Sequence, residues 1–80
     1  MRNKIQVVPG WDPHRYDKLE RKVQRLDTSL LLDYADAAGS GMARAFGDFR
    51  RGGDTVSLEE VQEGLMSLWA IVQTLKARAV

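Results

Sequence analysis

The sequence is 80 residues long, with no cysteine, one histidine and a formal net charge of +1. A chain of this size buries only about 60% of its unfolded surface, so it forms one small domain at most. The composition excludes disulfides, thiolate metal sites and a histidine-rich metal cage. Regular helix packing, a partner chain or both must therefore stabilise the fold.

Charge is distributed unevenly along the chain. Residues 1–26 hold seven Lys and Arg against three Asp and Glu, a net of +4, whereas the remaining 54 hold five against eight, a net of −3. This split favours either contact with an acidic partner or docking of the first helix on the rest of the chain.

No segment has the length or polarity of a membrane or export signal. The longest apolar stretch, residues 64–72, is half of the roughly 18 residues that a membrane span needs. The N-terminus lacks the apolar region and cleavage site of a signal peptide. We therefore expect a cytoplasmic protein, in the host cytoplasm or the virion if a phage encodes it.

Residues 1–10 are predicted to form an extended arm. Ile5 and Val7 favour strand geometry, and Pro9 with Gly10 ends the segment. A single strand has no partner in this chain, so the arm must pair elsewhere, lie on the helices or fray.

A first helix is predicted at 13–26. Asp12 is a good N-cap, Pro13 suits the first helical position, and Trp11 can pack on Tyr16 across the cap. A narrow apolar stripe follows on an otherwise charged helix: Tyr16, Leu19, Val23 and Leu26.

A second helix is predicted at 28–51, capped by Asp27 or Thr28. Its apolar residues repeat in a coiled-coil-like pattern: Leu31, Ala35, Ala38, Met42, Ala45 and Phe49. Gly39 and Gly41 cost about 1 kcal/mol each relative to alanine in a helix interior. They indicate either close approach of a neighbouring helix or a kink.

A third helix is predicted at 57–78. Ser57 with Glu60 forms a capping box, Val56 with Val61 forms a hydrophobic staple, and Gly52 can end the preceding helix. The apolar residues at 3-4 spacing are expected to face the second helix: Leu58, Val61, Leu65, Leu68, Val72, Leu75 and Ala79.

These elements predict an all-α fold in a single domain, residues 1–80, with the arm at 1–10. The helices at 28–51 and 57–78 should form a long antiparallel hairpin because their linker is short. The helix at 13–26 completes a three-helix bundle, which oligomerisation could extend.

Nothing in the sequence predicts catalysis, a metal or a cofactor. Asp33, Asp36 and three glutamates are expected to point outward, whereas metal-binding carboxylates of helical bundles point into the core. Ser40, between two glycines, lacks the lysine of a phosphate loop and a histidine to activate it. His14 is expected to be solvated, and no small-molecule substrate is indicated.

Two surfaces are candidates for partner binding. A protein partner, either a second copy or another chain, would use apolar residues of the third helix and the arm: Met66, Trp69, Ile71, Ile5, Val7 and Trp11. A nucleic acid would use the basic first helix: Arg15, Lys18, Arg21, Lys22 and Arg25.

Four segments carry a resemblance to a group of proteins: Trp11-Asp12-Pro13, Leu26-Asp27-Thr28, Ala38 through Phe46, and Ser57-Leu58-Glu59-Glu60. Over residues 11–78 the chain resembles short uncharacterised helical proteins of actinobacteria and their phages, a likeness that transfers no activity. The expected function is a non-catalytic protein–protein interaction module, oligomeric, such as a small virion or assembly component. The alternatives are a small nucleic-acid-binding regulator and a phage-encoded inhibitor of a host protein.

Overall fold

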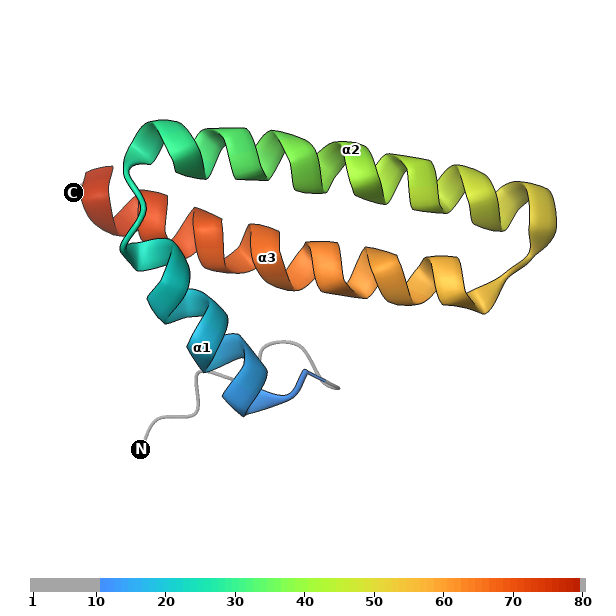
Figure 1. Cartoon of the computed structure of the whole chain (residues 1–80), viewed down its shortest axis with the longest axis horizontal. Coiled ribbons are helices and arrows are strands. Elements are labelled where there is room, and N and C mark those ends of the chain that lie inside the picture. Colours follow the sequence, from blue (N-terminus) through green and yellow to red (C-terminus); the bar gives the residue numbers. More distant parts are fainter. Residues whose placement is uncertain (1–10, 80) are drawn as a thin grey trace.

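The computed structural model describes residues 11–79, which form three helices and no strand. Helix α1 spans Pro13–Gln24, α2 spans Thr28–Gly52 and α3 spans Thr55–Ala79. α2 and α3 form an antiparallel hairpin, and α1 packs against α3 near the end of the hairpin at which the α1–α2 connection lies (Figure 1). The predicted all-α arrangement is confirmed, while the arm with Ile5 and Val7 lies outside the described residues. Within residues 11–79, no helix is long and apolar enough to cross a bilayer.

Two of the three predicted helix starts are confirmed. The Asp12 carboxylate accepts a hydrogen bond from the His14 N–H at 3.0 Å, and the Asp27 carboxylate accepts one from the Leu30 N–H at 2.9 Å. Each side chain satisfies a backbone donor that has no partner inside its helix. Asp27 rather than Thr28 is therefore the N-cap of α2.

The third helix start differs from the prediction. The Asp54 carboxylate accepts a hydrogen bond from the Val56 N–H at 3.0 Å, and α3 begins at Thr55. Ser57 lies inside the first turn and is buried, so the predicted capping box is wrong. An aspartate directly after the turn offers an acceptor earlier in the chain, and the helix starts there.

The turn between α2 and α3 also differs by one residue. Gly53, not Gly52, takes the left-handed conformation with φ 67°, and its N–H donates to the Phe49 carbonyl at 2.6 Å. Glycine suits this position because a Cβ would be strained there.

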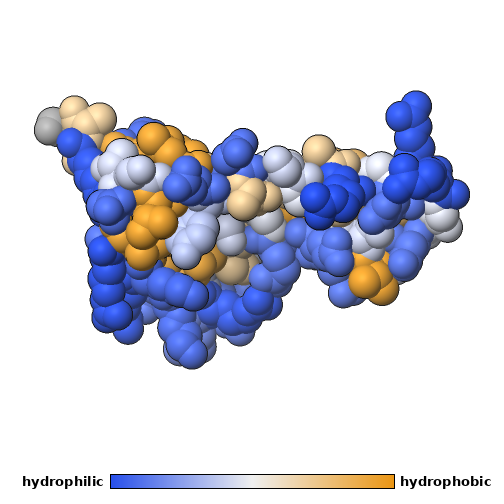
Figure 2. Space-filling view, turned by 45° about the horizontal axis from the view of Figure 1, so that its top comes forward, coloured by the Kyte–Doolittle hydropathy of each residue, from blue (hydrophilic) through white to orange (hydrophobic). Residues whose placement is uncertain are grey.

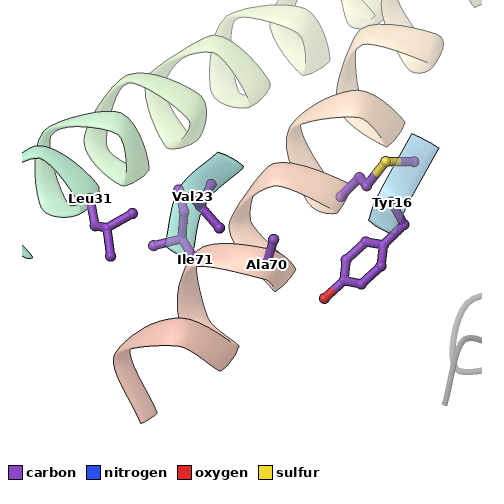
Figure 3. Packing of buried hydrophobic residues seen from close by; sticks show 6 residues of the cluster. Tyr16, Val23, Leu31, Ala70 and Ile71 are labelled. Atoms are coloured by element: carbon purple, nitrogen blue, oxygen red, sulfur yellow. The ribbon is translucent and has the colours of Figure 1, made fainter. Parts of the chain in front are cut away.

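The hydrophobic core lies where α1 meets the hairpin. Figure 3 shows Val23 of α1 near Leu31 of α2 and Ile71 of α3, with Tyr16 of α1 farther along α3 beyond Ala70. Leu31 and Ile71 are the largest fully buried side chains. Burying a side chain of this size contributes about 1.5–3 kcal/mol. The predicted apolar stripe of α1 therefore faces the core, as expected.

The predicted inward face of α3 is partly wrong. Leu65 and Val72 are each 45% exposed, although their spacing favoured a position against α2. Instead Met66, Ala70 and Ile71 are buried. α3 packs against α2 on one side and α1 on another, so its buried arc is rotated away from the regular leucine and valine stripe.

The glycines of α2 are not where the helices approach closely. α2 continues through Gly39 and Gly41 without a break, and a Cβ on either would meet nothing within 4 Å. Close packing within the chain is therefore not the reason for these glycines among the described residues, and a kink at this point stays a prediction. Close approach occurs at Gly64 of α3, where a Cβ would stand 2.5 Å from Met42 Cγ and 2.8 Å from its Sδ.

Arg78 in the last turns of α3 forms hydrogen bonds with the connection between α1 and α2. Its guanidinium donates to the carbonyl oxygens of Gln24 at 3.2 Å and Leu26 at 2.5 Å, and to the Thr28 hydroxyl at 3.1 Å. The carbonyls beyond the last turn of a helix carry partial negative charge, which a nearby cation stabilises. This contact fixes where α1 ends relative to the hairpin.

Candidate interaction surfaces

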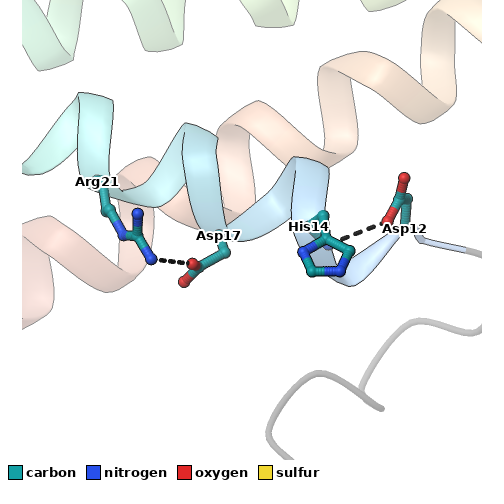
Figure 4. A network of polar contacts seen from close by, with 4 residues as sticks. All are labelled: Asp12, His14, Asp17 and Arg21. Carbon is teal, nitrogen blue, oxygen red and sulfur yellow. Dashed lines mark hydrogen bonds and ion pairs between the residues drawn. The ribbon is translucent and has the colours of Figure 1, made fainter.

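The polar face of α1 carries the residues predicted for nucleic-acid binding. All five are exposed: Arg15, Lys18, Arg21, Lys22 and Arg25. The residues at 15, 18, 22 and 25 share one side of the helix because they are three or four residues apart. Arg21 pairs with Asp17 at 2.6 Å, as Figure 4 shows beside the Asp12 cap. Arg15 pairs with Glu63 of α3, also at 2.6 Å. Two of the five cations therefore lie against carboxylates, which weakens the attraction of this face for phosphate.

An aromatic cluster forms at the start of α1. The rings of Trp11 and Tyr16 stack at 5.6 Å between centroids, as the predicted staple required. Trp11 also meets Trp69 of α3 edge-on at 6.4 Å. Burial, together with the neighbouring Glu20 carboxylate, raises the pKa of Tyr16 to about 12. Of these residues Trp69 reaches solvent most, at 38% exposed, and it lies at the edge of the cluster.

The acidic residues point outward, as predicted. Asp33 and Asp36 on α2 and the three glutamates at 59, 60 and 63 on α3 are exposed. No group of three metal-ligating side chains comes together among residues 11–79. His14 and Ser40 are also exposed, as single side chains on separate helices.

A groove separates α1 from α2, because α1 packs chiefly on α3. Its volume is about 340 Å³, and it has apolar walls with Lys22, Tyr34 and Ser67 as polar groups. The lining residues come from all three helices: Leu19, Lys22, Val23, Leu26, Tyr34, Ala38, Ser67 and Ile71. In the view of Figure 2, hydrophobic side chains reach the surface chiefly over the left-hand half, where α1 packs against the hairpin. The volume is at the low end for ligand pockets, and no residue of 11–79 closes the groove over a ligand.

The other side of the hairpin carries a second apolar surface, which we call the open hairpin face. Its exposed members are Leu32, Gly39, Phe46, Leu65 and Val72. Half-buried residues of the seam between α2 and α3 lie between them: Ala35, Met42, Leu58 and Leu68. Four large side chains of this face are strongly exposed: Leu32 at 54%, Phe46 at 53%, and Leu65 and Val72 at 45% each.

Helical spacing places this face away from α1. Tyr34 and Ala38 of α2 line the groove beside α1, and at 3.6 residues per turn Leu32, Gly39 and Phe46 lie on the opposite flank of the same helix. The same reasoning separates Leu65 and Val72 of α3 from Ser67 and Ile71, which line the groove. Both helices therefore present apolar residues to the side that α1 leaves uncovered.

The residues predicted to bind a protein partner are only partly suited to it. Met66 and Ile71 are buried in the core cluster that also contains Tyr16, Val23 and Leu31, so neither side chain is available at an exposed surface of α3. Trp11 packs against that core, and Trp69 is the one predicted residue of α3 that reaches solvent. Leu65 and Val72 occupy exposed positions instead. Their regular spacing indicates helix contact, but spacing alone does not show which helix they contact.

Comparisons of the chain with protein-family models, curated proteins and solved structures give no match.

Proposed function

We propose that the chain is a non-catalytic protein–protein interaction module whose binding surface is the open hairpin face. The observation that carries the proposal is the exposure of Leu32, Phe46, Leu65 and Val72 together on one side of the hairpin. Contiguous exposed apolar surface on a small protein is typical of an interaction site. The working form is an oligomer or complex in the cytoplasm, of the kind found in small phage virion or assembly components.

A partner helix or helix pair suits this face. The exposed members of the face recur every seven residues on each helix, at 32, 39 and 46 on α2 and at 65 and 72 on α3, which is the pattern that packs against other helices. The face is apolar from Leu32 to Phe46 and from Leu58 to Val72, and the charged Arg50 and Lys76 follow beyond its ends. An apolar helical surface bound to this centre would be removed from water, which favours such a partner over a charged ligand.

The test is site-specific photo-crosslinking in cells that express the protein. A benzophenone side chain at position 32 lies on the open hairpin face, and one at the adjacent position 33 lies on an exposed surface outside it. We expect one discrete crosslinked product from position 32 and none from position 33. Equal crosslinking from both positions, or none from either, would contradict the proposal.

A nucleic-acid-binding regulator is the alternative function, supported by the exposed basic side of α1. It predicts salt-dependent binding that weakens when Lys18, Lys22 and Arg25 are replaced by Gln. The same replacements leave the open hairpin face unchanged, so they separate the two functions. For an inhibitor of a host protein, the third candidate function, position 32 would crosslink to a host protein, which peptide mass spectrometry of the product would identify.

A further inference from the structure

We infer that the occupant of the open hairpin face is a second copy of this chain, and that two hairpins form a four-helix bundle with each α1 on the outside. This inference rests on the proposed function and adds the identity of the partner. It begins from the repeat on each helix. On α2 the face follows Leu32, Ala35, Gly39, Met42 and Phe46, at spacings of three and four residues.

The α3 side of the face has the same repeat. Leu58, Leu65 and Val72 are each seven residues apart, with Leu68 between the last two. A seven-residue apolar repeat indicates a helix that packs lengthwise against other helices. Two such helices side by side present the surface that one half of a four-helix bundle presents to its other half.

The length of the face also allows a symmetric dimer. The face runs from Leu32 to Phe46 on α2 and from Leu58 to Val72 on α3, about 22 Å of each helix at 1.5 Å per residue. Two helices of about 10 Å diameter give a projected footprint on the order of 450 Å². A stable interface buries about 800 Å² of accessible surface on each partner, so the face forms the apolar centre of such an interface and the surface around it supplies the remainder.

The shape of the face is complementary to itself under a twofold axis. Gly39 leaves α2 without a side chain at this point and open space around it, since a Cβ there would meet nothing within 4 Å, and Leu65 of α3 is 45% exposed. The two residues lie at the same level of the hairpin, because Gly64 packs against Met42 and Ala38. A twofold axis parallel to the hairpin sets α2 against the α3 of the second copy, so that each Leu65 faces the Gly39 of the other chain. This contact would also explain Gly39, because a Cβ at that position would meet no other described residue.

The experiment measures the mass of the purified protein by sedimentation equilibrium over a range of concentrations. Wild type should be dimeric at micromolar concentration. Leu65→Glu should raise the dimer dissociation constant by about 100-fold or more, because it buries a charge without a partner. Leu30→Glu is the matched control, since Leu30 is exposed to a similar extent, at 41%, on the other flank of α2.

A second pair of variants tests the proposed contact between Gly39 and the Leu65 of the other copy. Gly39→Leu should dissociate the dimer, whereas Ser40→Leu, one residue away and outside the face, should leave it intact. Circular dichroism must show unchanged helix content for all four variants. Dissociation by Leu65→Glu and Gly39→Leu alone supports the inference, and equal effects in the matched controls would overturn it.

A monomeric wild type would also overturn the inference, but would leave the proposed function standing if position 32 still crosslinks to a product of another mass. A dimer that dissociates as expected, with a crosslinked product of twice the chain mass, supports both. A monomer without any crosslinked product removes both.

Discussion

Ile71 and Val72 are neighbours in the chain, yet Ile71 is buried beneath α1 and Val72 is almost half exposed on the open hairpin face. The same contrast holds on α2, where Leu31 is buried and Leu32 is 54% exposed. These pairs show that the hairpin is apolar on two sides and that α1 covers only one. The single chain therefore contains more helix-packing surface than its own three helices bury.

The two sides also differ in their polar contacts. On the covered side, Arg78 fastens the α1–α2 connection and Arg15 pairs with Glu63 of α3. The centre of the open hairpin face is apolar, and the charged Arg50 and Lys76 lie beyond its ends. α1 covers the first side, whereas among residues 11–79 no helix covers the open face, whose apolar centre has the composition of an interface core.

The largest expected difference between the two sides is in the free energy of unfolding when Leu31 or Leu32 is replaced by alanine. Leu31→Ala should lower the free energy of unfolding by about 2–5 kcal/mol, since it leaves a cavity in the core. Leu32→Ala, measured in dilute protein so that association does not contribute, should change it by about 0.5 kcal/mol or less. Urea denaturation measures both. Equal losses would show that the two flanks of α2 are equally buried.

Tyr16 tests the covered side through pH. Its pKa is raised to about 12 by burial and the Glu20 carboxylate, whereas the phenol in the unfolded chain ionises near 10. The folded chain therefore keeps a proton that the unfolded chain loses, and the stabilising effect is fully present below about pH 10. It is lost as the pH rises from about 10 to about 12, by at most about 3 kcal/mol.

Tyr16→Phe should reduce the decrease in unfolding free energy between about pH 10 and pH 12, because the variant lacks the phenol. Tyr34→Phe, at an exposed position, should show the same decrease as the wild type. Urea denaturation across the alkaline range measures both variants. An unchanged alkaline slope in Tyr16→Phe would show that another group causes it.

Two glycines give a smaller effect of opposite sign. Gly64→Ala should destabilise the fold by about 1–2 kcal/mol, because the new methyl group collides with Met42. Gly39→Ala should stabilise the dilute monomer by about 1 kcal/mol, since alanine favours the helix and the space is open. Thermal unfolding in dilute solution compares them, and Met42→Ala should relieve the effect of Gly64→Ala. A loss of stability in Gly39→Ala would mean that this position is already packed within the chain.

Local signals in the sequence predicted the helices well. Asp12 and Asp27 act as caps because each offers a carboxylate directly before a helical segment, and the stripe on α1 faces the core because that helix has a single apolar side. The outward position of Asp33 and Glu59 follows from the same periodicity.

Contacts between distant segments were not predictable in the same way. The stripe from Leu58 to Val72 is the most regular in the chain, but periodicity does not state how many helices α3 must contact. Docking of α1 buries Met66 and Ile71, and leaves Leu65 and Val72 exposed. Sequence reasoning also missed Arg78, whose acceptors lie some 50 residues away in the chain.

The most direct test of the difference between the two sides is the reactivity of Ile71→Cys and Val72→Cys toward a maleimide. The chain has no cysteine of its own, so each variant has a single reactive thiol. In dilute protein, Val72→Cys should react rapidly and Ile71→Cys slowly, and concentrating the protein should protect Val72→Cys alone. Equal rates for the two thiols, or a Val72→Cys rate that does not change with concentration, would contradict an open face that a second copy covers.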